Sequence, residues 1–318
     1  MTTVIQPASE QTAVDKAKKQ PRVHLQRKHE LSGKRAGVAP YLFILPFFLL
    51  FLAFILYPLI YSFVLSFSKW KAGNMEFVGL DNYVHLFTDP LFGKSLLNTG
   101  MILLVQVPVM LILATCIAAL LNSERLKFRG LLQVAFFLPA IIDLVTYSLV
   151  FSMFFNESSG MVNQLLQWLG LDPVAWRTDG FWAKILIICA LTWRWTGYNS
   201  VIILSGLQMI PKELYEAASI DGAGRVRSFF AITVPQLKPI LLFCMILSTI
   251  GTLQIFTEPY VLTSGGPNNE TLSSIQYLYQ AAFKTFNFGL ASAGAYIVMT
   301  IIAVLSYIQL RLSKGGEI

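Results

Sequence analysis

The segment Trp193–Pro235 reads WRWTGYNSVIILSGLQMIPKELYEAASIDGAGRVRSFFAITVP. An apolar run ends near Leu207. The pattern then predicts a helix from Pro211 to about Ile220, because Pro is well tolerated in a first helical turn, where its missing N–H would have no partner. Asp221-Gly222-Ala223-Gly224 breaks that helix, since glycine supplies the backbone freedom of a sharp turn. A short amphipathic run leads through Val234-Pro235 into the next apolar run. The segment therefore predicts two apolar spans joined by a helix-turn-helix at residues 208–236, which we call the elbow.

The composition predicts a membrane protein. Of the 318 residues, 55% are hydrophobic and 13% are charged, which is too apolar for a soluble domain of this size. Runs of about 20 apolar residues are typical of membrane helices, and only helices or closed barrels satisfy the backbone in lipid. The expected fold class is all-α, a polytopic membrane protein with six transmembrane helices. The expected spans are about 40–66, 97–121, 131–155, 183–207, 237–262 and 289–311.

The distribution of positive charge predicts the topology. With the N-terminus inside, about 17 of the 24 Lys and Arg residues lie in inner segments, as the positive-inside rule requires. Both termini and the elbow are then cytoplasmic. This charge follows the membrane and does not indicate nucleic-acid binding. Residues 1–38 are polar and basic without an apolar period, so we expect a disordered cytoplasmic tail before a membrane domain at 39–318.

The elbow carries a motif. Glu216-Ala217-Ala218, then Asp221 to Gly224, then Ile232, Val234 and Pro235 resemble the EAA motif of permease subunits in ABC importers that work with a binding protein. The resemblance implies the type I ABC importer permease (MetI-like) fold, with residues 208–236 as a cytoplasmic coupling loop that docks into the ATPase subunit. The coupling residues that it implies are Glu216, Ala217, Ala218, Asp221, Gly222, Ala223, Gly224 and Pro235.

Three further stretches resemble sugar-uptake permeases of this family. They are Phe77–Tyr83 (FVGLDNY), Leu97-Asn98-Thr99 and Tyr260–Pro267 (YVLTSGGP). The implied function is the transmembrane subunit of an importer that moves a sugar across a bacterial or archaeal cytoplasmic membrane. The implied partners are a second permease subunit, two ATPase subunits, an extracytoplasmic solute-binding protein and membrane lipids. ATP and Mg²⁺ would be bound by the ATPase subunits, so we expect no cofactor and no enzymatic activity in this chain.

Polar side chains inside the expected spans are candidates for a substrate path, because they are costly in lipid. Spans four and five supply most of them. By resemblance to the maltose permease subunit, Tyr198 and Ser248 match in residue type and position, whereas several corresponding positions hold other residues, so the sugar stays open. The candidate path residues are Arg194, Tyr198, Ser248, Gly251, Thr252, Ile255 and Glu258.

Other interpretations of these residues remain open at this point. Ser248 and Thr252 could bond to their own helix, and Arg194 could pair with Asp143 or Glu258. Alternatively, Arg194 could clamp an acidic or phosphorylated sugar, since Arg suits carboxylate and phosphate groups.

Other functions fit the sequence less well. An ATP-independent secondary transporter or channel would leave the elbow motif unexplained. Gly93-Lys94-Ser95 resembles the end of a phosphate-binding loop, but Thr88 stands where that loop needs glycine. Cys116, Cys189 and Cys244 form neither a metal pattern nor a disulfide framework.

Overall fold

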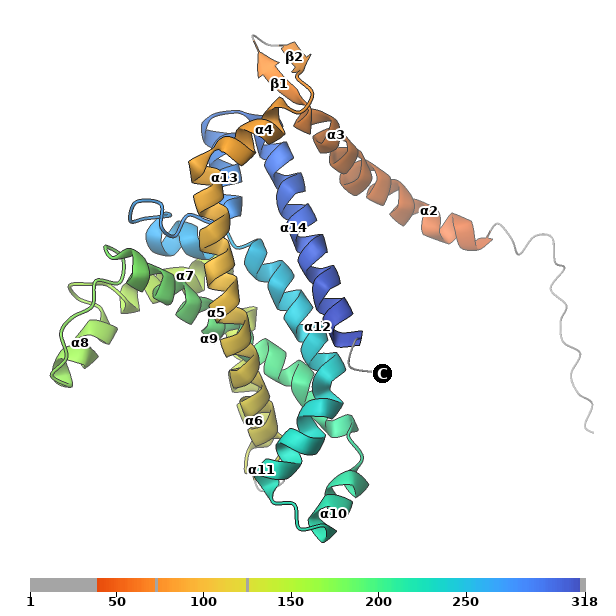
Figure 1. Cartoon of the computed structure of the whole chain (residues 1–318), viewed down its shortest axis with the longest axis vertical. Coiled ribbons are helices and arrows are strands. Elements are labelled where there is room, and N and C mark those ends of the chain that lie inside the picture. The colour runs from red at the N-terminus through yellow and green to blue at the C-terminus, as the bar shows by residue number, and fades with distance from the viewer. Residues whose placement is uncertain (1–38, 72–73, 124–125, 315–318) are drawn as a thin grey trace, which may run out of the picture. The chain divides into compact units, whose positions relative to one another are not determined.

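The computed structural model describes residues 39–71, 74–123 and 126–314, which form helices, one short hairpin and connecting loops (Figure 1). The chain divides into two compact units, residues 1–58 and 59–318. The expected tail at residues 1–38 lies outside the described residues.

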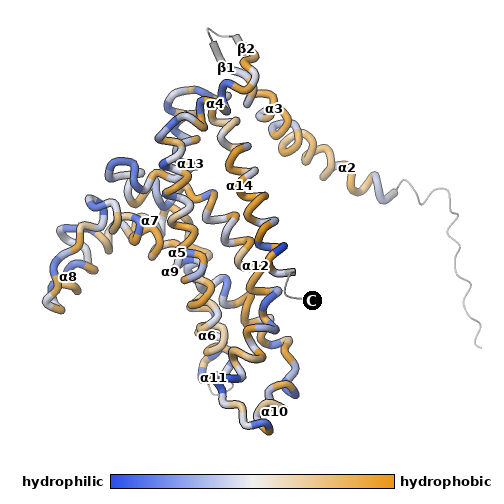
Figure 2. The backbone as a smooth tube through the Cα atoms, in the orientation of Figure 1, coloured by the Kyte–Doolittle hydropathy of each residue, from blue (hydrophilic) through white to orange (hydrophobic). Residues whose placement is uncertain are grey.

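The first unit contains α2 (Ala39–Phe51), the π-helical turn η2 (Leu52–Leu56) and the first two residues of α3 (Tyr57–Ser66). Figure 2 shows that these segments are predominantly hydrophobic. Residues 40–50 are all exposed, and no residue of the most apolar window in Pro40–Ser66 is buried. An apolar helix with no protein around it suits a lipid environment.

Four long helices form the centre of the second unit. They are α5 (Pro90–Leu121), α9 (Gly180–Met209), α12 (Val234–Leu253) and α14 (Phe288–Lys314). α5 packs along α9, and α12 packs against both α5 and α14. The core that α5, α9 and α12 share includes Met110, Ala114, Ile203 and Leu237, all fully buried.

Helices lie along all six expected spans, although the third and fifth spans depart from a single helix. Within the part of the chain that the structure describes, four helices are long and apolar enough to cross a membrane: Pro40–Ser66, Pro90–Leu121, Arg225–Leu253 and Phe288–Ser313. The bent pair α6 (Arg129–Ile141) and α7 (Leu144–Phe154) meets the same test when it is taken together. α9, with 30 residues, is long enough, so its polar composition keeps it from meeting this test.

The third expected span, 131–155, is not one continuous helix. α6 and α7 meet at an angle of 98°, with Ile142 and Asp143 between them. Asp143 caps α7, because its Oδ1 accepts hydrogen bonds of 3.0 Å from the backbone N–H groups of both Val145 and Thr146. The helix that follows the bend, α7, is therefore capped at its N-terminus by Asp143.

The fifth expected span, 237–262, differs from the helix at both ends. The helix begins at Arg225, with α11 (Arg225–Ser228) and the π-helical η3 (Phe229–Thr233) leading without a break into α12. It ends at Leu253, before the separate π-helical turn η4 (Pro259–Thr263). The hydroxyl groups of Ser273 and Ser274 bond the carbonyls of Ile255 and Leu253, which the end of the helix leaves free.

The FVGLDNY stretch, Phe77–Tyr83, joins the β-hairpin to α4 (Asp81–Thr88) at one end of the second unit. β1 (Ser68–Lys71) pairs antiparallel with β2 (Asn74–Phe77), and α4 follows. Asn82 is completely buried, and its Nδ2 donates to the carbonyls of Ser66 at 2.9 Å and Ser68 at 3.0 Å. This motif thus ties α4 to the end of α3 and to the hairpin.

Candidate functional site

A small pocket lies where α5, α9 and α12 meet. Five of the seven predicted path residues line it, together with four that were not predicted. The predicted residues are Tyr198, Ser248, Gly251, Thr252 and Ile255, and the additional ones are Gln106, Trp195, Asn199 and Leu247. Predicted path residues from two distant parts of the sequence therefore line the same pocket.

The polar groups of this pocket are uncharged. Thr252 Oγ1 donates to Gln106 Oε1 at 2.9 Å, and Asn199 Nδ2 donates to the carbonyl of Trp195 at 2.9 Å. The hydroxyl groups of Tyr198 and Ser248 have no hydrogen-bond partner among the described residues. The pocket thus offers free hydroxyl groups beside aromatic rings, a combination that suits a neutral polyhydroxylated ligand.

The pocket is small, with a volume of about 70 Å³. Sites for small molecules usually measure roughly 300–1,000 Å³. The pocket in this conformation is therefore too small to enclose a ligand of the usual size.

Arg194 does not line this pocket. Its guanidinium donates to the carbonyls of Ile142 at 2.6 Å, Ala140 at 3.2 Å and Pro139 at 3.4 Å. These carbonyls lie at the C-terminal end of α6, where a helix leaves them without intrahelical partners. Neither Asp143 nor Glu258 forms an ion pair with Arg194 among the described residues. Arg194 thus caps α6.

Glu258 also lies away from the pocket lining. It is 4% exposed, and its Oε1 accepts a hydrogen bond from the hydroxyl of Tyr147 on α7. The ring of Tyr147 in turn faces the Arg194 guanidinium, 4.8 Å from its centre.

The elbow has the geometry that its sequence predicts. α10 (Lys212–Ile220) follows Pro211, which stands at its N-cap. At its end, Gly222 has φ +78°, Ala223 N–H bonds the carbonyl of Ala218 at 2.8 Å, and Gly222 N–H bonds that of Ser219 at 3.1 Å. This pair of bonds is a Schellman motif, which requires the left-handed conformation that glycine adopts without strain.

The two arms of the elbow contact each other. The hydroxyl groups of Tyr215 on α10 and Thr233 in η3 lie 2.8 Å apart. Glu216 is exposed on α10 and has no ion-pair partner among the described residues, and Ala217 beside it is also exposed. Gly224 caps α11, and Pro235 lies in the first turn of α12. The elbow therefore presents a carboxylate and a small side chain on its surface.

The Leu97-Asn98-Thr99 motif on α5 contacts the loop that follows the YVLTSGGP motif. Asn98 Nδ2 donates to the carbonyls of Asn269 at 2.8 Å and Leu272 at 3.2 Å, and Lys94 Nζ donates to that of Asn268 at 2.7 Å. Glu270 of the same loop forms an ion pair of 3.3 Å with Lys184 on α9. The loop after η4 is thus fixed against α5 and α9.

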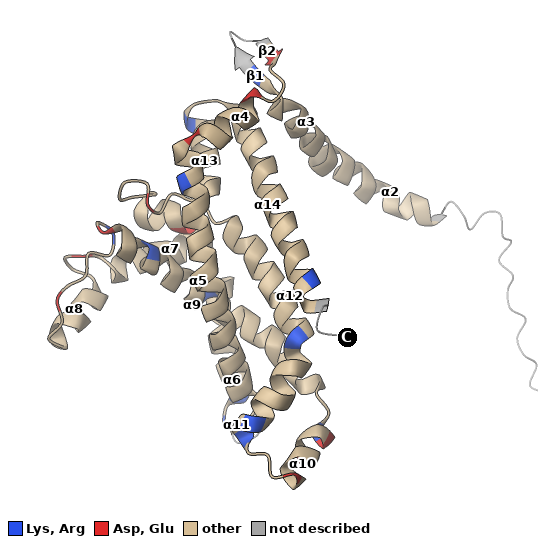
Figure 3. Ribbon diagram, viewed as in Figure 1, with Lys and Arg blue, Asp and Glu red and all other residues tan. Residues whose placement is uncertain are grey.

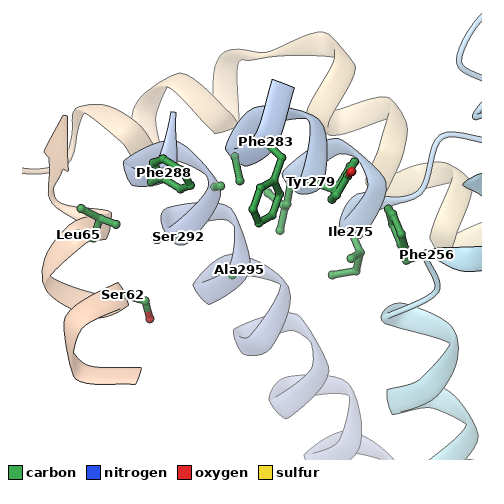
Figure 4. A pocket seen from close by; sticks show the side chains of 12 residues that line it. Ser62, Leu65, Phe256, Ile275, Tyr279, Phe283, Phe288, Ser292 and Ala295 are labelled. Carbon is green, nitrogen blue, oxygen red and sulfur yellow. The ribbon is translucent and has the colours of Figure 1, made fainter. Parts of the chain in front are cut away.

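A larger groove lies beside α3 and α14, and its lining includes Leu65, Phe256, Tyr279 and Phe288 (Figure 4). Its volume is about 520 Å³, but its lining is almost wholly apolar. It lacks the convergent polar groups that fix a polar ligand. We therefore place the candidate substrate site in the smaller pocket.

The fold and the pocket together define the membrane-spanning component of a transport system. Residues 38–315 match the family described as "Binding-protein-dependent transport system inner membrane component", and the chain belongs to this family. It is therefore a multi-pass membrane protein.

Relatives cover nearly the whole chain. It is 42% identical over 293 residues to the lactose transport system permease protein LacF of Rhizobium radiobacter, covering 91% of this chain and 96% of that protein. It is 38% identical over 285 residues to the arabinooligosaccharides transport system permease protein AraP of Halalkalibacterium halodurans, covering 88% and 90%.

A solved structure has the same fold. It is titled as a bacterial alginate ABC transporter in complex with alginate pentasaccharide-bound periplasmic protein. One of its chains aligns with a TM-score of 0.75 at 24% identity, over 86% of this chain and 93% of that chain. This likeness confirms the predicted MetI-like permease fold.

Proposed function

We propose that this chain is one of two permease subunits of an ABC importer that carries a neutral sugar across the cytoplasmic membrane. The observation that carries the proposal is the pocket in which Tyr198, Ser248 and Thr252 meet Gln106. The family and the sugar-transport names of the relatives support the same class. An uncharged lining favours a neutral sugar over an acidic one, because a buried anion needs a charged partner.

The small volume of the pocket supports a second permease subunit that supplies the opposite wall. We infer that a binding protein delivers the sugar from outside, and that two ATPase subunits contact Glu216, Ala217 and Ala218. The chain itself would then bind no cofactor and catalyse no reaction, since ATP and Mg²⁺ belong to the ATPase subunits.

The elbow is proposed to face the cytoplasm, as do both termini. Arg225 and Arg227 lie on α11, and Figure 3 shows Lys and Arg there and near the C-terminal end of α14. Positive charge gathered at one end of a membrane domain supports this orientation.

The proposal is tested by uptake of radiolabelled neutral sugars into vesicles that hold the complete importer. We expect uptake to require ATP inside and the binding protein outside. Ser248→Ala, which removes a free hydroxyl without adding bulk, should raise KM about fivefold, as expected for one lost hydrogen bond. Uptake driven by an ion gradient without ATP would instead indicate a secondary transporter.

A further inference from the structure

Three buried polar side chains meet where the third, fourth and fifth spans approach one another. Arg194 comes from α9, Tyr147 from α7, and Glu258 from the segment that follows α12. Their exposed fractions are 6%, 1% and 4%. Burying such groups is costly unless each is held by specific contacts, so their arrangement needs a reason.

The contacts form one connected path. The guanidinium of Arg194 bonds three carbonyls at the end of α6 and lies over the ring of Tyr147, whose hydroxyl donates to Glu258. Because lipid offers no partner to the carbonyls at a helix end, the 98° bend between α6 and α7 depends on this guanidinium. The path therefore joins the bend to the segment after α12.

The same path borders the substrate pocket. The guanidinium lies 5.5 Å from the ring centre of Trp195, which contacts the ring of Tyr198 edge-on at 5.8 Å. Both rings line the pocket. Ile255, three residues before Glu258 in the chain, lines it as well. A shift of the cluster would move parts of two pocket walls.

We infer that Arg194, Tyr147 and Glu258 are positioning residues for sugar transport: they hold the bent third span against the fourth and fifth and thereby set the shape of the pocket. This inference rests on the proposed sugar import. It assigns Arg194 a role other than clamping an anionic sugar, since its two terminal nitrogens already bond protein carbonyls.

The test compares the complete wild-type importer in vesicles with Tyr147→Phe, Glu258→Leu and the double variant, using lactose and a neutral trisaccharide. Tyr260→Phe is the matched control, because it removes a nearby hydroxyl that has no partner among the described residues. KM, kcat and the amount of assembled complex are measured for each variant.

We expect each single variant to change the ratio of kcat/KM for the two sugars by about tenfold, and the double variant to add nothing further, because both break one hydrogen bond. The control should leave the ratio unchanged. A merely structural role would lower the amount of complex and leave the ratio intact, and that result would overturn the inference.

Arg194→Lys separates positioning from ligand binding. A lysine keeps the charge but cannot reach several carbonyls and stack on a ring, so we expect it to change the kcat/KM ratio of the two neutral sugars, as Tyr147→Phe does. Retained uptake of a uronic-acid disaccharide by this variant, with loss in Arg194→Leu, would instead assign Arg194 to an anionic substrate. A wild-type importer that carries no sugar would contradict the proposed function and not this cluster.

Discussion

At the scale of single residues, the glycines Gly197 and Gly251 differ in the space that surrounds them and that a side chain would need. A Cβ at Gly197 on α9 would collide with the backbone of Phe136 on α6, whereas a Cβ at Gly251 on α12 meets nothing within 4 Å. Gly197→Ala should therefore destabilise the complex by about 1–3 kcal/mol, as overpacking does, measured as a lower Tm. Gly251→Ala should leave Tm unchanged and raise KM, since its methyl group enters the pocket. Equal Tm values for both variants would contradict this packing.

Of the pocket residues that were not predicted, Gln106 carries a signal in the sequence, but that signal alone does not identify a site. Gln106 is 1% exposed inside an apolar span, and such a polar residue is a candidate by cost alone. The resemblance points to spans four and five, whereas Gln106 lies in span two. Arg194 lies outside the pocket lining for a physical reason: its partners are backbone carbonyls at a break, and the sequence around Ile142 predicts a continuous span.

At the scale of elements, the connection between α7 and α9 depends on one carboxylate outside the spans. Glu157 Oε1 accepts backbone hydrogen bonds from Arg177 at 2.7 Å and Thr178 at 2.8 Å. Partial burial alone would raise the pKa of Glu157, but these bonds outweigh it and hold the pKa below its ordinary value. A lowered pKa contributes stability that is present above the ordinary value and is lost as pH falls through the folded one.

Proteolysis of residues 156–179 from the outside should therefore accelerate as pH drops below about 4, the usual range of glutamate. Glu157→Gln should be cleaved faster at neutral pH and respond less to acid, because it has no charge to lose. Identical pH profiles for the two proteins would contradict this role.

Helix ends were predictable where local residues mark them and not where tertiary contacts do. Pro211 and Gly222 mark the bounds of α10, and α10 was predicted nearly to the residue. The end of α12 at Leu253 has no such mark, because the hydroxyl groups that donate hydrogen bonds to the carbonyls of Leu253 and Ile255 lie about 20 residues later, at Ser273 and Ser274.

At the scale of the whole molecule, the elbow is the expected point of contact with the ATPase subunits. Glu216→Lys reverses the charge of the first residue in the EAA motif, and Gly222→Pro removes the left-handed turn and an N–H that bonds Ser219. We expect both to abolish uptake and ATPase docking while membrane insertion stays normal, measured by co-purification and vesicle uptake. Ser219→Ala on the same helix is the control, and wild-type uptake by both variants would refute the coupling role.

The helix from Arg225 to Leu253 has 29 residues and no break, so it is about 43 Å long. It joins the elbow to Ser248 in the pocket. In the proposed importer, a displacement of Gly224 by the ATPase subunits would therefore move Ser248 as well. A molecule bound under the elbow would then block sugar transport without contacting the sugar.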